Sequence, residues 1–404
     1  MPETPPPGAE PLDPVPAPRV LLAGGGTAGH VNPLLATAAA LREPALGGRE
    51  ETGILVLGTA EGLEADLVPE AGFDMSVVPR VPMPRRPTGD LFMLPRRLSR
   101  AVGAAAEAIE AVDAQVVVGF GGYVSTPAYL AARRAGVPVV IHEQNARPGL
   151  ANRLGASWAA AVALTFASTP LRSSRGRTEV TGLPLRPAIG ELVARLAEPD
   201  GAAAARRAGA AALGLDPRAP TVLITGGSLG AQHLNEVLAA ALPSLSPDLQ
   251  VLHLTGRDKD GPVRAAVEAA VADGAASDLA ERYHVLDYLV AMEQAYACAD
   301  GVICRSGAGT VAELTALGLP ALYVPLPIGN GEQRLNAADV VAAGGGRLVA
   351  DARLTAADVV DFTALLTRPA ERGAMAAAAA STGVRDGARR LADLIRRPDR
   401  KSVV

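Results

Sequence analysis

The sequence predicts an α/β protein built from two doubly wound parallel-sheet domains that face a central cleft. Short apolar runs alternate with Ala- and Leu-rich helical stretches, as in buried parallel strands joined by helical crossovers. The glycine-rich opening of the fold also recurs about half a chain later. A length of 404 residues fits two domains at roughly 150 residues each, or three small ones. Open sheets of this kind bind ligands at the carboxyl ends of their strands, so we expect the functional site in the cleft.

The first domain is expected to span residues 19–183, after a tail at residues 1–18. The tail is Pro-rich and polar and holds too little apolar surface to order itself. A helix is predicted through Leu34, Leu35 and Leu41. Apolar runs predict strands at residues 19–24, 53–59, 114–120 and 137–143.

The second domain is expected to span residues 184–370. Its opening VLITGGSLG (222–230) repeats VLLAGGGTAG (20–29), and a helix follows each copy. We therefore expect two domains of similar topology, joined near residues 181–187. Further strands are predicted at residues 249–256, 282–288, 300–307 and 320–326.

The chain ends in a segment, residues 371–404, that is predicted to hold an amphipathic helix. Leu391, Leu394 and Ile395 recur there at helical spacing and form one apolar stripe. We expect this helix to pack back toward the first domain.

Composition and charge exclude several classes of protein. Hydrophobic residues make up 49% and charged residues 20%, which suits a globular protein with a large core. A formal net charge of -4 offers no basic field for nucleic acid, so no nucleic-acid partner is expected. Two cysteines are too few for a disulfide framework or a CxxC metal site. The sequence shows neither a signal peptide nor a membrane-spanning run, so a cytosolic protein is expected.

Residues 24–29 read Gly-x-Gly-x-x-Gly between a strand and a helix, which matches the dinucleotide-binding pattern. An NAD site would also need an acid about 20 residues further on, at the end of the second strand. That strand ends too late, and the nearest acids are Glu61 and Glu64. The loop is therefore interpreted as an anion or diphosphate site made of backbone N–H groups, or as a tight packing turn. His30 follows it directly.

The second glycine loop, residues 226–231, also precedes a helix but lacks the lysine of a P-loop. Ser228 and the helix N-terminus could hold a phosphate, and the alternative is an ordinary strand-to-helix turn. A third loop, residues 304–313, follows a strand. Its Thr310 and Glu313 fit a capping box, or Glu313 faces the cleft from the first helical turn and accepts two ribose hydroxyls.

Polar segments at further strand ends complete the candidate site. Residues 119–123 (GFGGY) and 142–145 (HEQN) each follow an apolar strand, where a doubly wound domain places its ligand. For His142 itself a buried, hydrogen-bonded role is the default. Residues 331–336 (GEQRLN) follow another strand and could also be a polar helix start.

An apolar tip between arginine pairs lies within residues 81–100. Such a tip suits docking on an anionic bilayer at roughly 1 kcal/mol per basic residue, and the alternative is a core-packed segment. The tip consists of Leu91, Phe92, Met93 and Leu94, flanked by Arg85, Arg86, Arg96 and Arg97.

Seven motifs in order resemble the MurG family of peptidoglycan N-acetylglucosaminyltransferases, which have the GT-B fold. The resemblance implies that UDP-N-acetylglucosamine (UDP-GlcNAc) is the donor and that lipid I, undecaprenyl-diphospho-MurNAc-pentapeptide, is the acceptor. Lipid II would be the product, made without a cofactor at the cytoplasmic face of the cell membrane by a peripheral protein. Other cell-wall synthesis or division proteins are candidate partners. The motifs are GGGTAGH (24–30), GFGGY (119–123), HEQN (142–145), TGLPLR (181–186), GGSLGA (226–231), CRSGAGTVAE (304–313) and GEQRLNA (331–337).

The resemblance also assigns residues to each substrate. It places Ser228 and Arg186 at the donor diphosphate, the backbone near Leu289 at uracil, Glu313 at the ribose, and Gln333 and Asn336 at the sugar. Thr27, Gly29, Asn145 and Thr310 complete the donor set. The acceptor set is Gly25, Gly26, Thr27, His30, Tyr123 and Asn145. This chain departs from the common family pattern at Ala28, Leu183 and Glu332.

The implied reaction is one inverting displacement, in which the acceptor 4-hydroxyl attacks the anomeric carbon and UDP leaves. His30 is the candidate base because its ordinary pKa is near neutrality, although it could bind phosphate instead. Asn145 would assist catalysis or orient the acceptor. Arg186, Ser228 and backbone N–H groups would stabilise the leaving diphosphate without a metal.

Three other functions stay open on the sequence. A UDP-GlcNAc 2-epimerase or a glycolipid glycosyltransferase would use the same architecture. A nicotinamide oxidoreductase would use the first glycine loop. A noncatalytic scaffold would bind the nucleotide sugar without transferring it.

Overall fold

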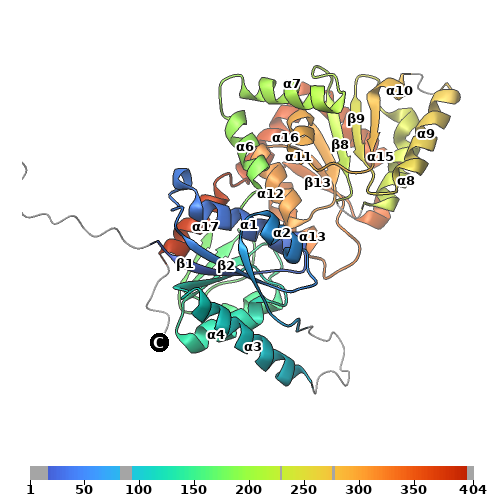
Figure 1. Cartoon of the computed structure of the whole chain (residues 1–404). Helices are drawn as coiled ribbons and strands as arrows, with labels where there is room; N and C mark the ends of the chain where they lie inside the picture. Colours follow the sequence, from blue (N-terminus) through green and yellow to red (C-terminus); the bar gives the residue numbers. More distant parts are fainter. Residues whose placement is uncertain (1–16, 82–92, 228–229, 275–277, 398–404) are drawn as a thin grey trace, which may run out of the picture.

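The computed structural model describes residues 17–81, 93–227, 230–274 and 278–397, and it contains two parallel sheets in separate domains (Figure 1). The first sheet has the strand order β3-β2-β1-β4-β5-β6-β7. The second has the order β10-β9-β8-β11-β12-β13. Every strand pair described is parallel, as predicted for doubly wound domains.

The first sheet is formed by the short apolar runs of residues 17–180, which pair side by side as parallel strands. Successive residues of β1 alternate between two cores: Leu21 packs under α3 and α4, whereas Val20 and Leu22 pack under α1. The strands are β1 (Arg19–Ala23), β2 (Gly53–Gly58), β3 (Asp74–Val77), β4 (Val116–Gly119), β5 (Val139–Glu143), β6 (Ala161–Leu164) and β7 (Arg177–Val180). The helices are α1 (Ala28–Arg42), α2 (Glu64–Glu70), α3 (Leu94–Ala111), α4 (Ser125–Ala135) and α5 (Leu150–Gly155).

The second sheet repeats this arrangement. Its strands are β8 (Thr221–Thr225), β9 (Gln250–Leu254), β10 (Tyr283–Leu286), β11 (Gly301–Cys304), β12 (Ala321–Tyr323) and β13 (Gly346–Leu348). Its helices are α6 (Pro187–Leu196), α7 (Gly201–Leu213), α8 (Gln232–Ala241), α9 (Asp260–Ala272), α10 (Leu279–Arg282), α11 (Met292–Cys298), α12 (Ala308–Leu317), α13 (Glu332–Asn336), α14 (Ala338–Ala342), α15 (Ala356–Leu366) and α16 (Pro369–Ser381). Short 3₁₀ turns cover Pro44–Leu46, Leu242–Ser244 and Asp351–Arg353.

The internal repeat corresponds to a real structural equivalence. Strands β1 and β8 both stand third in their sheets, and each is followed by a glycine loop and a helix. Four strands were not anticipated. β3, β7 and β13 are short edge strands with polar residues, and edge strands carry little apolar signal. β6 has the sequence AVAL, whose alanines do not distinguish strand from helix.

The chain crosses back to the first domain at its end. Helix α17 (Gly387–Arg396) packs on α1, and its Leu391, Leu394 and Ile395 join the core beneath β1 (Figure 1). Helix α16 still packs on α12 and α15 of the second domain. The predicted domain boundary at residue 371 therefore falls inside α16. The chain leaves the second domain for the first only after Ser381, where α16 ends. The boundary at 183/184 falls between β7 and α6.

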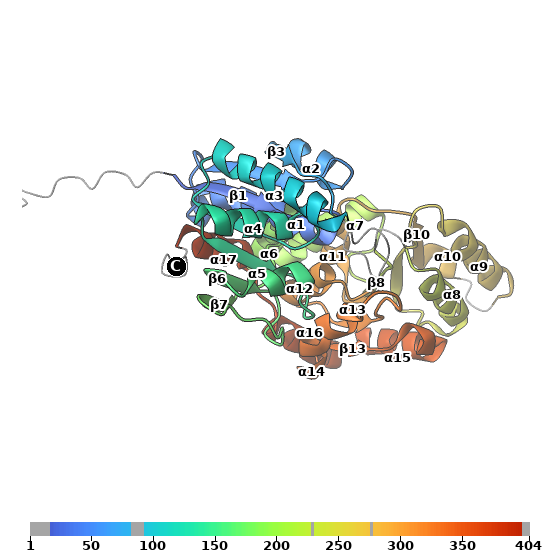
Figure 2. The same cartoon turned by 90° about the horizontal axis from the view of Figure 1, so that it is seen from below.

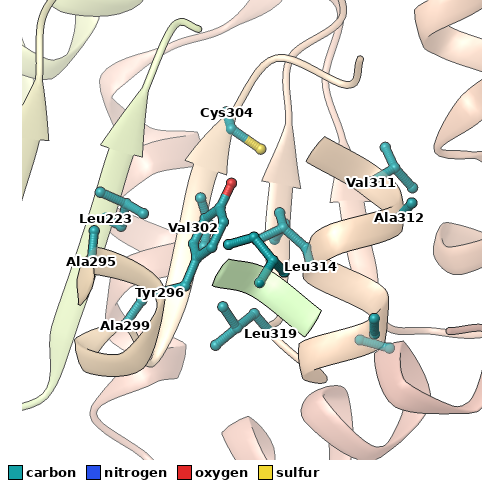
Figure 3. Packing of buried hydrophobic residues seen from close by; sticks show 14 of the residues in the cluster. Leu223, Ala295, Tyr296, Ala299, Val302, Cys304, Val311, Ala312, Leu314 and Leu319 are labelled. Atoms are coloured by element: carbon teal, nitrogen blue, oxygen red, sulfur yellow. The ribbon is translucent and has the colours of Figure 1, made fainter. Parts of the chain in front are cut away.

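The two domains lie side by side, with α12 and α13 at their border (Figure 2). Behind this border, buried residues of α11, α12 and β11 form one apolar cluster (Figure 3). Tyr296 of α11 stands in this cluster beside Val302 of β11 and Leu314 of α12, with its hydroxyl at the upper end of the ring (Figure 3). This cluster supports the carboxyl ends of the second sheet.

Candidate active site

A cavity of about 830 Å³ lies at the carboxyl ends of the first sheet and reaches the second domain. Asn330 and Glu332 of the second domain complete its wall. The structure thus brings together residues that the sequence placed in three separate motifs. All six predicted acceptor residues line it: Gly25, Gly26, Thr27, His30, Tyr123 and Asn145.

His30 is fixed to the first glycine loop by its Nδ1 atom. Nδ1 lies 3.1 Å from the carbonyl oxygen of Gly25 and 3.2 Å from Oγ1 of Thr27. A carbonyl oxygen only accepts, so Nδ1 carries the proton in that bond and the lone pair of neutral His30 is on Nε2. Burial lowers the pKa of His30, while the Gly25 hydrogen bond and the charge of Glu64 oppose that shift. His30 is thus largely neutral near pH 7, as a general base requires.

Glu64 lies behind the same loop and is fully buried. Its carboxylate accepts hydrogen bonds from the N–H of Gly26 at 2.8 Å, and from the N–H and the hydroxyl of Thr59 at 3.0 and 2.7 Å. Although burial acts to raise the pKa of Glu64, these donors outweigh it and the pKa is lowered. The carboxylate therefore holds the loop from behind. It is not free to bind a ribose, and it engages one N–H that the anion-site interpretation had assigned to a ligand.

The loop after β5 is organised by a second buried carboxylate, Glu143. Its oxygens accept from the N–H groups of Asn145 and Gly149 and from the side chain of Asn152. Asn152 in turn accepts from the hydroxyl of Tyr129 at 2.7 Å. Burial raises the pKa of Glu143. Neither Glu143 nor Asn152 was predicted from the sequence as a site residue, although Glu143 stood inside the HEQN motif.

His142 has the buried structural role that was its default interpretation. It is fully buried, and its Nε2 donates to the carbonyl of Gly182 at 3.0 Å, at the crossing between the domains. Gln144 donates to the Nδ1 atom. Burial lowers the pKa of His142 to about 4, so the ring stays neutral.

Asn336 of α13 joins the two domains. Its Oδ1 accepts from the N–H of Ala146 at 2.8 Å, and its Nδ2 donates to Oδ1 of Asn145 and to the carbonyl of Ser306, both at 3.3 Å. Arg147 also donates to the carbonyl of Asn330. Asn145 and Asn336, predicted to meet the substrates, are thus linked to each other across the cleft.

On the donor side, Arg186 and Glu313 form a two-pronged ion pair. Nε and Nη2 of Arg186 donate to the two carboxylate oxygens at 2.8 and 3.0 Å, and the hydroxyl of Tyr296 donates to Glu313 at 3.1 Å. Helix α12 begins at Ala308 with Gly307 as its N-cap, so Thr310 lies inside the helix. The capping-box interpretation is therefore wrong. Glu313 also lies on the second helical turn, not the first.

The other predicted donor residues have separate surroundings. Gln333 accepts from the N–H of Leu326 at 2.9 Å and fixes the loop after β12. Leu289 follows β10 and packs on the cluster that contains Tyr296. Gly29 lies in the first turn of α1. Ser228 lies outside the described residues.

Family comparisons now identify the architecture. Residues 20–164 match the model of the glycosyltransferase family 28 N-terminal domain, and residues 221–391 match that of the C-terminal domain. The chain belongs to glycosyltransferase family 28. It is therefore a glycosyltransferase, and the nicotinamide interpretation of its first glycine loop is wrong.

Relatives within family 28 are similar over most of their length. One from Bifidobacterium longum (strain DJO10A) is 51% identical over 346 residues, 84% of this chain and 86% of the relative. One from Nocardioides sp. is 50% identical and covers 93% of this chain and 97% of the relative. Both are named UDP-N-acetylglucosamine–N-acetylmuramyl-(pentapeptide) pyrophosphoryl-undecaprenol N-acetylglucosamine transferase.

Solved structures agree on the fold. The crystal structure of Acinetobacter baumannii MurG superposes with a TM-score of 0.74 at 27% identity, over 94% of this chain and 99% of that one. A UDP-GlcNAc 2-epimerase from Neisseria meningitidis superposes with a TM-score of 0.64 at 16% identity, over 93% and 98% of the two chains. The epimerase likeness concerns the GT-B fold alone.

The predicted membrane tip of this family 28 chain is only partly described. Leu91 and Phe92 lie outside the described residues, as do Arg85 and Arg86. Met93 is 47% exposed, and Leu94 lines the active-site cavity at the start of α3. Arg96 and Arg97 follow on that helix. None of the described helices is both long and apolar enough to cross a membrane.

Proposed function

We propose that this chain transfers N-acetylglucosamine from UDP-GlcNAc to the 4-hydroxyl of the muramoyl sugar of lipid I, forming lipid II. The observation that carries the proposal is the 51% identity, over 84% of the chain, to a relative named for that transfer. The acceptor cavity supports it, because the histidine, the glycine loop and the HEQN loop line one space.

His30 acts as the general base. Nε2 takes the proton of the acceptor 4-hydroxyl, while that oxygen forms a bond to the anomeric carbon of the donor sugar. The bond from the anomeric carbon to the diphosphate oxygen breaks, and its electron pair leaves with UDP. Attack from the face opposite to UDP inverts the configuration and gives a β-1,4 linkage. The transition state resembles an oxocarbenium ion, by analogy with glycoside hydrolysis.

The Arg186–Glu313 ion pair forms the centre of the proposed donor site. Ribose hydroxyls donate to Glu313 and compete with Arg186 for its oxygens, which releases the guanidinium toward the diphosphate. There Arg186, Ser228 and backbone N–H groups stabilise the charge that develops as UDP leaves. This supply of donors makes a metal unnecessary, so transfer should persist in excess EDTA.

The prenyl chain of the acceptor leaves the cavity along an apolar rim. Leu94 of α3 and Leu150 and Leu154 of α5 line the cavity, and Leu150 is 70% exposed. Arg96 of α3 and Arg153 of α5 belong to the same two helices. An apolar surface beside basic side chains suits peripheral binding to anionic lipid at the cytoplasmic face of the membrane. Sedimentation with vesicles, with and without anionic lipid, tests this binding.

Radiolabel transfer from UDP-GlcNAc to a lipid I analogue tests the function itself. The proposal predicts a labelled lipid-linked disaccharide that forms only with acceptor present. Incubation with donor alone provides the discriminating arm, because a 2-epimerase would convert the sugar to its manno epimer without an acceptor. Binding of UDP-GlcNAc without product in either arm would indicate a scaffold.

A further inference from the structure

One peptide group connects a buried carboxylate to the active-site histidine. The N–H of Gly26 donates to Oε2 of Glu64 at 2.8 Å, and the carbonyl of Gly25, in the same peptide group, lies 3.1 Å from Nδ1 of His30. We propose that Glu64 is a positioning residue that acts on His30 through this peptide, holding its proton on Nδ1 and strengthening Nε2 as a base. This inference rests on the proposed function only for the role of His30 in transfer.

The electrostatics of the arrangement give the direction of the effect. A carboxylate that accepts from a peptide N–H polarises that peptide and makes its carbonyl a stronger acceptor. The carbonyl then holds the Nδ1 proton more firmly, and the positive charge that His30 gains on taking up a proton is stabilised. The field of Glu64 raises the pKa of His30 against the lowering by burial. A histidine buried without this support would be a weaker base.

Gly25 of the first loop, together with two glycines at and after the end of β2, leaves room for the carboxylate. A Cβ added at Gly25 would lie 2.2 Å from Oε1 of Glu64, and one added at Gly62 would lie 2.1 Å from Oε2. At Gly58 it would lie 2.7 Å from Cγ of Glu64. Three glycines from separate segments thus surround one side chain. This gives the glycine loop a function besides anion binding, since it admits an acid behind the histidine.

Other charged groups share the cavity with His30. Glu64 reaches the first glycine loop from α2, behind the cavity. The charged residues of the cavity wall itself are Glu61, Arg80, Glu143, Arg147 and Glu332. Glu143 is held by hydrogen bonds from the N–H groups of Asn145 and Gly149. Glu64 is the carboxylate whose charge raises the pKa of His30.

The test is the pKa of His30 measured by NMR on ring-labelled histidine, in the full chain and in Glu64→Gln. The resonance is assigned with His30→Ala. Removing the charge should lower the pKa of His30 by about half a unit or more. The acidic limb of kcat/KM for transfer should move down by the same amount, and the plateau should fall about 10-fold. Glu70→Gln removes a charge from the exposed end of the same helix and should move neither value.

A His30 pKa that is unchanged in Glu64→Gln would overturn the inference, even if activity falls, because a purely structural role lowers activity without moving the titration. If the variant does not fold, the ¹⁵N shifts of wild-type His30 decide instead. The inference predicts the Nδ1–H tautomer in the neutral ring, and the Nε2–H tautomer would overturn it. A shifted pKa together with full activity of His30→Ala would leave the connection intact and refute the proposed base.

Discussion

Arg186 donates two hydrogen bonds, of 2.8 and 3.0 Å, to the two carboxylate oxygens of Glu313. Arg186 comes from the segment between the domains and Glu313 from α12, so the pair ties that segment to the donor domain. Tyr296 supplies a third contact to the carboxylate from beneath. If Glu313 binds the donor ribose as proposed, loosening the support of its carboxylate should weaken donor binding.

Tyr296→Phe should weaken donor binding without blocking the chemical step. The change removes one hydrogen bond to a charged acceptor, worth about 1.5–3 kcal/mol, so the KM for UDP-GlcNAc should rise about 10-fold or more while kcat changes little. Steady-state kinetics with varied donor provide the measurement. Tyr323→Phe is the matched control, because the hydroxyl of Tyr323 has no hydrogen-bond partner among the described residues. Equal kinetics for both variants would contradict the assigned role of Tyr296.

His30→Ala should lower kcat by about 10²-fold or more, the usual scale for loss of a general base. The far-UV circular dichroism should stay unchanged, because the ring lines the cavity and is not part of the apolar core. His233→Ala, on the exposed face of α8, controls for the loss of a histidine as such. Retention of wild-type turnover by folded His30→Ala would remove this residue from the chemistry.

Much of this architecture could be predicted because buried parallel strands appear in the sequence as short apolar runs. The repeat of residues 20–29 at 222–230 located two equivalent glycine loops, and the stripe at Leu391 located the helix that crosses back. The edge strands β3, β7 and β13 escaped prediction because they are short and polar and lack that signal. Strand β6 escaped because alanine fits helix and strand alike.

The motifs predicted residues that the fold gathers around one cavity, but not the contacts that these residues make. Motifs identified His30 and Glu313, yet spacing could not show that Arg186 would occupy the Glu313 carboxylate. Spacing argued against Glu64 as the acid of a dinucleotide site, but it could not show that Glu64 binds the backbone of its own domain. These relationships join residues far apart in the sequence, and only the packed domains bring them together.

Leu391→Ala should destabilise the first domain although it lies at the end of the chain. Leu391 is fully buried in the core shared by α17, α1 and β1, and truncation of such a leucine removes about 2–5 kcal/mol of stability. Urea unfolding measures the loss. Leu335→Ala, at a leucine that is 42% exposed, serves as the control and should change little. A smaller loss at Leu391 than at Leu335 would contradict the docking of α17.

Stability should fall as the pH drops below about 6.5, because two histidines are buried in the neutral form. Burial lowers the pKa of His142 to about 4 and that of His253 to about 3, from an ordinary value of 6.5. Between these values and 6.5 the unfolded chain binds protons that the folded chain excludes. Each histidine then removes roughly 1.4 kcal/mol of stability per pH unit. The urea midpoint of unfolding should change less with pH in His142→Gln than in the wild type. If the midpoint changed equally with pH in both proteins, His142 would not be buried in its neutral form.

The decisive measurement is acceptor-dependent transfer of N-acetylglucosamine by the purified protein. Purified protein, labelled UDP-GlcNAc and a lipid I analogue are incubated together, and the lipid fraction is analysed for the disaccharide. The wild-type protein should form labelled lipid-linked GlcNAc-MurNAc in proportion to acceptor, with or without EDTA, and His30→Ala should form far less. Folded protein that binds UDP-GlcNAc but yields no acceptor-dependent product would contradict it.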